Sequence, residues 1–143
     1  MTATLHMIKL CVGTDRVGDL AAWQAERRAA WPDNLPRHIT RMWPKRAAEL
    51  LDGGSLYWVM GGLVLCRQRI LRLDRVEGED GIARCGIVLD PDLHRTHAAP
   101  RRPFQGWRYL TSGDAPPDLR TSRASDDALP EHLNRALAEI GVR

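Results

Sequence analysis

The segment from His94 to Tyr109 holds the densest set of side chains that could bind an anion. It contains four arginines, two histidines and no acidic residue, and it ends in the run Pro103-Phe104-Gln105-Gly106-Trp107-Arg108-Tyr109. Guanidinium groups pair with phosphates and aromatic rings stack on bases, which are the contacts that single-stranded nucleic acid requires. The alternative is that the aromatic rings anchor a loop to a strand while the arginines are solvated. The candidate ligand-binding residues here are Arg101, Arg102, Gln105, Trp107, Arg108 and Tyr109.

A second basic group lies at the start of a predicted short helix. Trp43-Pro44-Lys45-Arg46 stands where the free backbone amides of that helix favour an anion. Two further arginines, Arg67 and Arg69, belong to a predicted long strand. If the fold brings these groups beside the first segment, they form the second wall of a basic cleft. The alternative is a structural Trp43 with exposed charges next to it.

Two histidines, His94 and His97, are the weak candidates for catalysis. An imidazole titrates near neutrality and can move a proton, but no partner for either ring is identifiable in the sequence. With Asp90 and Asp92 these rings could hold a metal, yet the chain has no HExxH or comparable spacing. It also lacks a GxSxG serine and a glycine-rich phosphate loop. We therefore expect no metal and no cofactor.

The composition is typical of one globular domain. Apolar residues make up 43% and charged residues 27% of the 143 residues, and we expect a single domain over residues 1–143. The net charge is +3, and because only Lys9 and Lys45 are lysines, 19 of the 21 basic residues are arginines. Either bidentate anion contacts or the base composition of the coding genome can produce such a bias.

The sequence also indicates a cellular location. Arg67 ends the longest apolar run, Leu56–Cys66, which is shorter than the ~20 apolar residues that span a bilayer. Met1–Val12 has neither the basic region nor the cleavage site of a signal peptide. We expect a cytoplasmic protein with no membrane partner. The three cysteines, Cys11, Cys66 and Cys85, are far apart and lie in apolar runs, which favours buried thiols over a metal or redox role.

The pattern of helices and strands predicts an α+β fold. We expect a mostly antiparallel curved sheet or partial β-barrel with about three flanking helices. Gly61-Gly62 predicts a hairpin turn, while Asp90–Gly106 and Ser112–Ser125 are expected to be irregular. The predicted extended segments are Leu5–Val12, His38–Trp43, Leu56–Met60, Leu63–Val76, Ile82–Leu89 and Trp107–Thr111, and the predicted helices are Val17–Ala30, Pro44–Leu51 and Leu129–Ile140.

Three motifs give the chain a resemblance to a known family. Ile8–Gly13, Thr40–Pro44 and Pro103–Leu110 resemble members of the family called domain of unknown function 1489, which are uncharacterised bacterial proteins. The resemblance spans nearly the whole chain and implies no established activity.

A weaker resemblance is to PUA-like and ASCH-type domains, small β-barrels associated with RNA or modified nucleotides. Lys45–Gly54 leads into Leu56 here as a short helix that ends in glycine leads into barrel strands there. The Gly-x-Lys turn and following Glu of those domains are replaced by Gly53-Gly54-Ser55-Leu56-Tyr57. This resemblance implies a PUA-like fold and an RNA or nucleotide partner.

These observations favour a domain that binds single-stranded RNA or a nucleotide-like anion without catalysis. One alternative is a small enzyme that holds an anionic or nucleotide-like substrate with arginines and uses His94 or His97 as its acid–base group. Another is a protein-interaction module in which tryptophan and arginine form the main contacts. A basic cleft would favour the binding domain, a buried pocket would favour the enzyme, and an exposed apolar patch would favour the interaction module.

Overall fold

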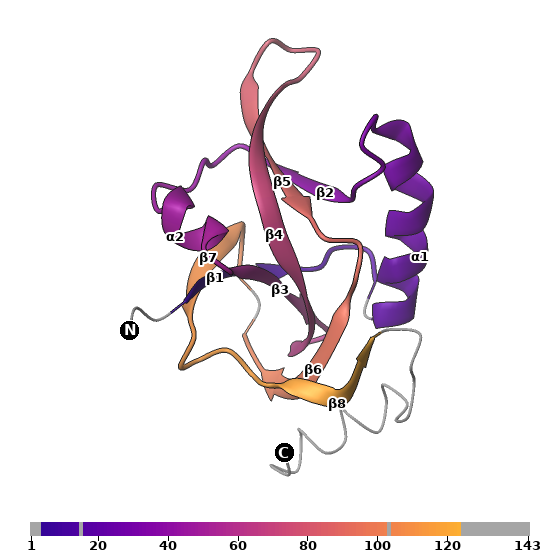
Figure 1. Cartoon of the computed structure of the whole chain (residues 1–143), viewed down its shortest axis with the longest axis vertical. Helices are drawn as coiled ribbons and strands as arrows, with labels where there is room; N and C mark the ends of the chain where they lie inside the picture. Colours follow the sequence, from indigo (N-terminus) through magenta and orange to yellow (C-terminus); the bar gives the residue numbers. More distant parts are fainter. Residues whose placement is uncertain (1–3, 15, 103, 124–143) are drawn as a thin grey trace.

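The computed structural model describes residues 4–14, 16–102 and 104–123 and has an α+β fold dominated by sheet (Figure 1). Among the described residues, strands and helices alternate irregularly, and the helices lie before Ser55. The strands are β1 (Leu5–Leu10), β2 (Arg37–Thr40), β3 (Ser55–Met60), β4 (Leu63–Glu77), β5 (Ala83–Leu89), β6 (His94–Pro100), β7 (Trp107–Thr111) and β8 (Asp118–Arg123), and the helices are α1 (Val17–Arg27), the 3-10 helix η1 (Arg28–Ala30) and α2 (Ala47–Leu51).

The long strand β4 joins the two parts of the sheet. Its first half pairs with β3 on one side and β6 on the other, and its second half pairs with β5. β1 and then β7 extend the sheet beyond β3, β2 pairs with β5, and β8 pairs with β6. The eight described strands form a mixed sheet that does not close, in which β1 and β3 are parallel and the other pairs are antiparallel. The outer end of the β4–β5 hairpin projects beyond the other elements (Figure 1).

The turn between β3 and β4 explains why these strands form a hairpin. Gly61 and Gly62 have φ angles of 57° and 82°, a conformation that glycine adopts without steric cost. Two consecutive residues in the left-handed region match the twist of a tight hairpin. The predicted Gly61-Gly62 turn is therefore confirmed.

The central strands bury apolar side chains on both faces. On one face, Met7 of β1 and Leu56 of β3 belong to the main core, whereas Ile8 and Tyr57, the next residues along, belong to a smaller cluster on the other face. This follows from the alternation of side chains along a strand. Residues of odd number in β1 therefore face the main core, a rule that also applies to Lys9.

Helix α1 lies against the main core and is held there by an amide pair. Val17 and Leu20 are buried on its inner side. Gln24, one turn further on, donates to Gln68 of β4 over 2.9 Å and accepts from the same amide over 2.6 Å. Gln68 also accepts from the Trp58 indole over 2.9 Å and donates to the Asp90 carbonyl over 3.1 Å. This network ties α1, β3 and β4 together.

The largest differences from the predicted elements lie in the second half of the chain. The stretch predicted as a loop, Asp90–Gly106, contains β6, and the stretch predicted as irregular, Ser112–Ser125, contains β8. The α1 prediction was right in place, although its last turn is the 3-10 helix η1, and α2 is shorter than expected. The predicted third helix, Leu129–Ile140, lies outside the described residues. Within the described part of the chain, none of the helices has the length and apolarity needed to cross a membrane.

Candidate functional site

The two aromatic residues of β7 pack inside the molecule. Trp107 is 5% exposed and donates its indole N–H to the Met42 carbonyl over 3.1 Å. Its ring meets Tyr109 edge to face, with 5.0 Å between the ring centroids. The Tyr109 hydroxyl accepts the backbone N–H of Arg46 over 3.1 Å. The fold thus brings the predicted second wall onto β7, but these contacts serve to hold the 42–46 loop in place.

The arginines predicted to share a cleft lie on the opposite face from these rings. Arg108 is paired with Ile8, and the row continues across the sheet to Tyr57 and Arg67. Three strand spacings separate Arg108 from Arg67, about 14 Å at ~4.8 Å per strand. Arg67 is bound by Asp118 through two contacts of 2.8 and 2.7 Å and donates to Ser55 over 2.9 Å. Its guanidinium is therefore committed within the fold.

The other predicted ligand residues do not meet at one place. Two arginines lie near the Phe104 ring, Arg46 is paired with Glu49, and the rest are exposed. The guanidinium carbons of Arg101 and Arg108 lie 6.0 and 5.0 Å from the centroid of Phe104. Phe104 itself packs against the smaller apolar cluster. Arg46 is paired with Glu49 over 2.6 Å. The remaining candidates, Trp43, Lys45, Arg69, Arg102 and Gln105, are exposed.

The catalytic candidates His94 and His97 lie on β6. His94 is paired in register with Arg67 of β4, and the His97 backbone N–H donates to the Pro117 carbonyl over 2.9 Å. Both are half-buried in the strand, and neither lines the pocket described next. Among the described residues, no three His, Cys, Asp or Glu side chains are grouped so as to hold a metal ion.

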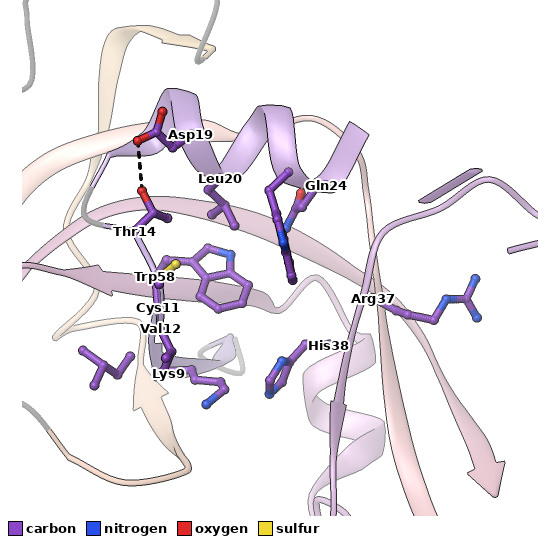
Figure 2. A pocket seen from close by; sticks show the side chains of 13 residues that line it. Lys9, Cys11, Val12, Thr14, Asp19, Leu20, Gln24, Arg37, His38 and Trp58 are labelled. Carbon is purple, nitrogen blue, oxygen red and sulfur yellow. Dashed lines mark hydrogen bonds between the residues drawn. The ribbon is translucent and has the colours of Figure 1, made fainter. Parts of the chain in front are cut away.

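A pocket of about 500 Å³ lies between α1, β1 and β2 (Figure 2). This volume is within the range of small-molecule sites. The indole of Trp58 lies in the middle of its wall, with Leu20 and Gln24 of α1 on one side and Lys9 and His38 on the other (Figure 2). The lining comprises Lys9, Leu10, Cys11, Val12, Gly13, Thr14, Asp19, Leu20, Trp23, Gln24, Arg37, His38 and Trp58.

Lys9 and His38 are the polar groups on one side of the pocket. Lys9 is paired with Trp58 in the sheet, and the His38 ring meets the Trp58 indole edge on, with 6.0 Å between centroids. Burial lowers the pKa of Lys9, an effect that Cys11 partly offsets. Burial, together with the charge of Lys9, lowers the pKa of His38 from 6.5 to about 4. Burial also raises the pKa of the Cys11 thiol to about 11, so at neutral pH the thiol is protonated and His38 is neutral.

The other charged residues of the lining are engaged elsewhere. The Asp19 carboxylate accepts the Thr14 hydroxyl over 3.2 Å at the start of α1 (Figure 2). Arg37 turns its guanidinium away from the pocket (Figure 2). It contacts Asp33 and lies 3.5 Å from Asp74, and it stacks on Trp31 at 4.2 Å. Lys9 is therefore the cation of the lining that remains available to a ligand.

Aromatic and amide groups complete the pocket. Trp23 is 49% exposed at the pocket edge, with the Arg27 guanidinium 4.5 Å from its centroid, whereas Trp58 is 5% exposed. Gln24 uses one N–H and one lone pair in its pair with Gln68. An amide has two N–H donors and an oxygen with two lone pairs, so Gln24 keeps one of each. The pocket can therefore take a flat ring and an anionic group together.

Sequence reasoning missed this pocket because its residues come from separate elements. In the sequence, Lys9 and Cys11 fall within the predicted strand Leu5–Val12, and Trp23 falls within the predicted helix Val17–Ala30. One signal was available. Lys9 has the same strand parity as Met7, so the alternation predicted an inward-facing lysine.

Comparison with known proteins identifies a family but no activity. No curated protein and no solved structure matches the chain. A family model described as "Protein of unknown function (DUF1489)" matches residues 7–143. Since this match covers nearly the entire sequence, the chain belongs to the DUF1489 family.

Proposed function

We propose that this protein binds a nucleotide-like anion, free or as one nucleotide of single-stranded RNA, in the pocket between α1, β1 and β2. The observation that carries the proposal is the arrangement of Lys9 beside the indole of Trp58, with Trp23 at the edge of the same pocket. A cation and aromatic faces are the two elements that nucleotide binding needs. The ligand leaves unchanged.

The ligand would be held by three kinds of contact. Its base stacks on Trp23, a contact that alanine substitution usually values at about 1–3 kcal/mol. The free N–H and lone pair of Gln24 bond to polar atoms of the base. The phosphate pairs with Lys9, and the neutral His38 ring beside it can donate a further hydrogen bond.

The weaker resemblance of the sequence to PUA-like domains, which are associated with RNA or modified nucleotides, favours the same ligand class. If the chain is PUA-like, its open mixed sheet corresponds to a partial, curved barrel. We also propose that binding takes place in the cytoplasm. Half-buried Arg101 and exposed Arg102 and Arg108 lie outside the pocket. They would contact the backbone of a longer RNA rather than the bound nucleotide.

The test is calorimetric titration of the whole chain at low salt with nucleoside monophosphates, the matching nucleosides, inorganic phosphate and a short single-stranded RNA. Monophosphates should bind more tightly than nucleosides or phosphate alone. A site for free nucleotides should bind the monophosphate and the RNA with equal affinity. A site for RNA should bind the RNA more tightly than the monophosphate, and the affinity for RNA should fall more steeply with salt concentration.

Two matched pairs of variants locate the site. Lys9→Met and Trp23→Ala should each weaken binding about tenfold, equivalent to ~1.4 kcal/mol. Lys45→Met removes the other lysine, and Trp43→Ala removes a tryptophan that is 46% exposed against 49% for Trp23. Both controls should leave binding unchanged. No binding at low salt, or equal losses in the control variants, would overturn the proposal.

A further inference from the structure

Lys9 differs chemically from nearly every other basic residue of the chain. Of the 21 basic residues, only Lys9 and Lys45 are lysines, and the remaining 19 are arginines. A guanidinium does not lose its proton in a protein, whereas an amine does when it is desolvated. Lys9, the basic side chain available in the pocket, is thus one of two basic side chains, Lys9 and Lys45, that can lose a proton and become a nucleophile.

The surroundings of Lys9 make its amine easier to deprotonate than that of a solvent-exposed lysine. Cys11, the residue after the end of β1, is a protonated thiol, and His38 on β2 is a neutral imidazole. Asp19 on α1 is bonded to Thr14, and Lys9 makes no ion pair with it or with any other described residue. Trp58 on β3, its partner in the sheet, is apolar apart from an indole N–H directed at Gln68. Among the described residues, no carboxylate therefore stabilises the ammonium, and burial lowers the pKa of Lys9.

We propose that Lys9 is a reactive amine that condenses with a small aldehyde or ketone entering this pocket. The neutral nitrogen attacks the carbonyl carbon, and the C=O π electrons move to oxygen. A proton passes from nitrogen to that oxygen, giving a carbinolamine. Loss of the hydroxyl group as water, with a second proton, leaves a C=N bond between Lys9 and the ligand. Nothing is oxidised or reduced, and water is the only product released.

His38 is placed to move the protons of this step. Lys9 and His38 lie on the same side of the Trp58 indole, close enough for the charge of Lys9 to affect the pKa of the imidazole (Figure 2). The ring makes no hydrogen bond with the described residues, so its nitrogens are open to the pocket. A neutral imidazole accepts one proton and returns it to the departing hydroxyl. His38 acts here as a proton-transfer group.

The experiment uses the unmodified whole chain, in which Lys45 is an internal control. The protein is incubated with acetaldehyde and sodium cyanoborohydride, which reduces the imine to a stable secondary amine, and the alkylation of each lysine is followed by peptide mass spectrometry. At pH 7 we expect Lys9 to react at least about fivefold faster than exposed Lys45. Its rate should also rise at a lower pH than the rate of Lys45. Equal or slower reaction of Lys9 would overturn the proposal.

A variant separates the role of His38 from simple exposure. His38→Gln should slow alkylation of Lys9 and leave Lys45 unchanged, provided that circular dichroism shows a folded chain. An unchanged Lys9 rate in folded His38→Gln would remove His38 from the step. The inference shares the pocket of the proposed function but does not require nucleotide binding. If Lys9 is alkylated fast and an added nucleoside monophosphate does not slow that reaction, only the proposed nucleotide binding is contradicted. If a nucleotide binds tightly but Lys9 is unreactive, only the proposed reactive amine is contradicted.

Discussion

The buried amide network behind the pocket provides the most quantitative prediction. Gln68 is 0% exposed and makes hydrogen bonds to Gln24, the Trp58 indole and the Asp90 carbonyl. Gln68→Met removes the partner of the buried Trp58 indole N–H and of the part-buried Asp90 carbonyl, at about 1–3 kcal/mol each. The methionine recovers about 1 kcal/mol by burying a more apolar side chain. We therefore expect the free energy of unfolding to fall by about 3 kcal/mol, the middle of a range of about 1–5 kcal/mol.

Gln24→Met tests the same network from the helix side. It removes only the bonds between the two amides, and Gln68 keeps its contacts with Trp58 and Asp90. The expected loss is about 1 kcal/mol. In the double variant this loss should nearly vanish, because the amide pair is already broken, which gives a coupling energy of about 1 kcal/mol.

Urea unfolding followed by circular dichroism at constant m-value measures these losses. Gln105→Met, at an exposed glutamine, is the control and should lie within about 0.5 kcal/mol of the wild type. Equal losses for the Gln68 and Gln24 variants, or no coupling between them, would refute the network as described.

Three further predictions concern the rest of the fold. The imidazole of His38 takes up a proton near pH 6.5 in the unfolded chain and only near pH 4 in the folded chain, so stability should fall as pH drops from 7 to 4.5, by about 2 kcal/mol from this group. His38→Phe should flatten this decline, as measured by urea titrations at each pH. Gly54→Ala would place a methyl group 2.4 Å from two backbone oxygens and should lower stability by about 3 kcal/mol. Gly18→Ala has open space in α1 and should raise stability by about 0.5 kcal/mol. The two variants should therefore shift the melting temperature in opposite directions, and shifts of the same sign would contradict this. Arg67→Met should lower stability by about 1–2 kcal/mol through loss of its bonds to Asp118, without weakening nucleotide binding; weaker binding would place Arg67 in the site.

Local sequence patterns predicted the strands that bury apolar side chains and missed those that bury polar side chains. β3 and the first half of β4 are runs of apolar residues, and their hairpin was confirmed. β6 buries Arg95 and Thr96 at 4% and 1% exposure, between β4 and β8. Such residues suit a strand interior only when long-range partners satisfy them. A window along the sequence does not contain those partners, so the sequence pattern predicts a loop over Asp90–Gly106, the stretch that contains β6.

The sequence pattern left open which of the predicted site residues lie on the same face of the sheet. Trp107 and Tyr109 face the main core, and Arg108 between them faces the opposite side of the sheet. Period-2 alternation requires this split once the segment is a strand. The pocket instead joins residues 9 to 58 through the β1–β3 pairing and the packing of α1. Those contacts depend on topology, which the sequence pattern left open.

The most direct test of the account follows the indole N–H signals of the five tryptophans by NMR during titration with a nucleoside monophosphate. Trp23 and Trp58 line the pocket, and exposed Trp43 lies outside it. The account predicts that the Trp23 and Trp58 signals shift together with increasing ligand while the Trp43 signal stays in place. Shifts confined to Trp43 and Trp107, with Trp23 and Trp58 unchanged, would contradict it and return the ligand to the arginine and aromatic segment of β7.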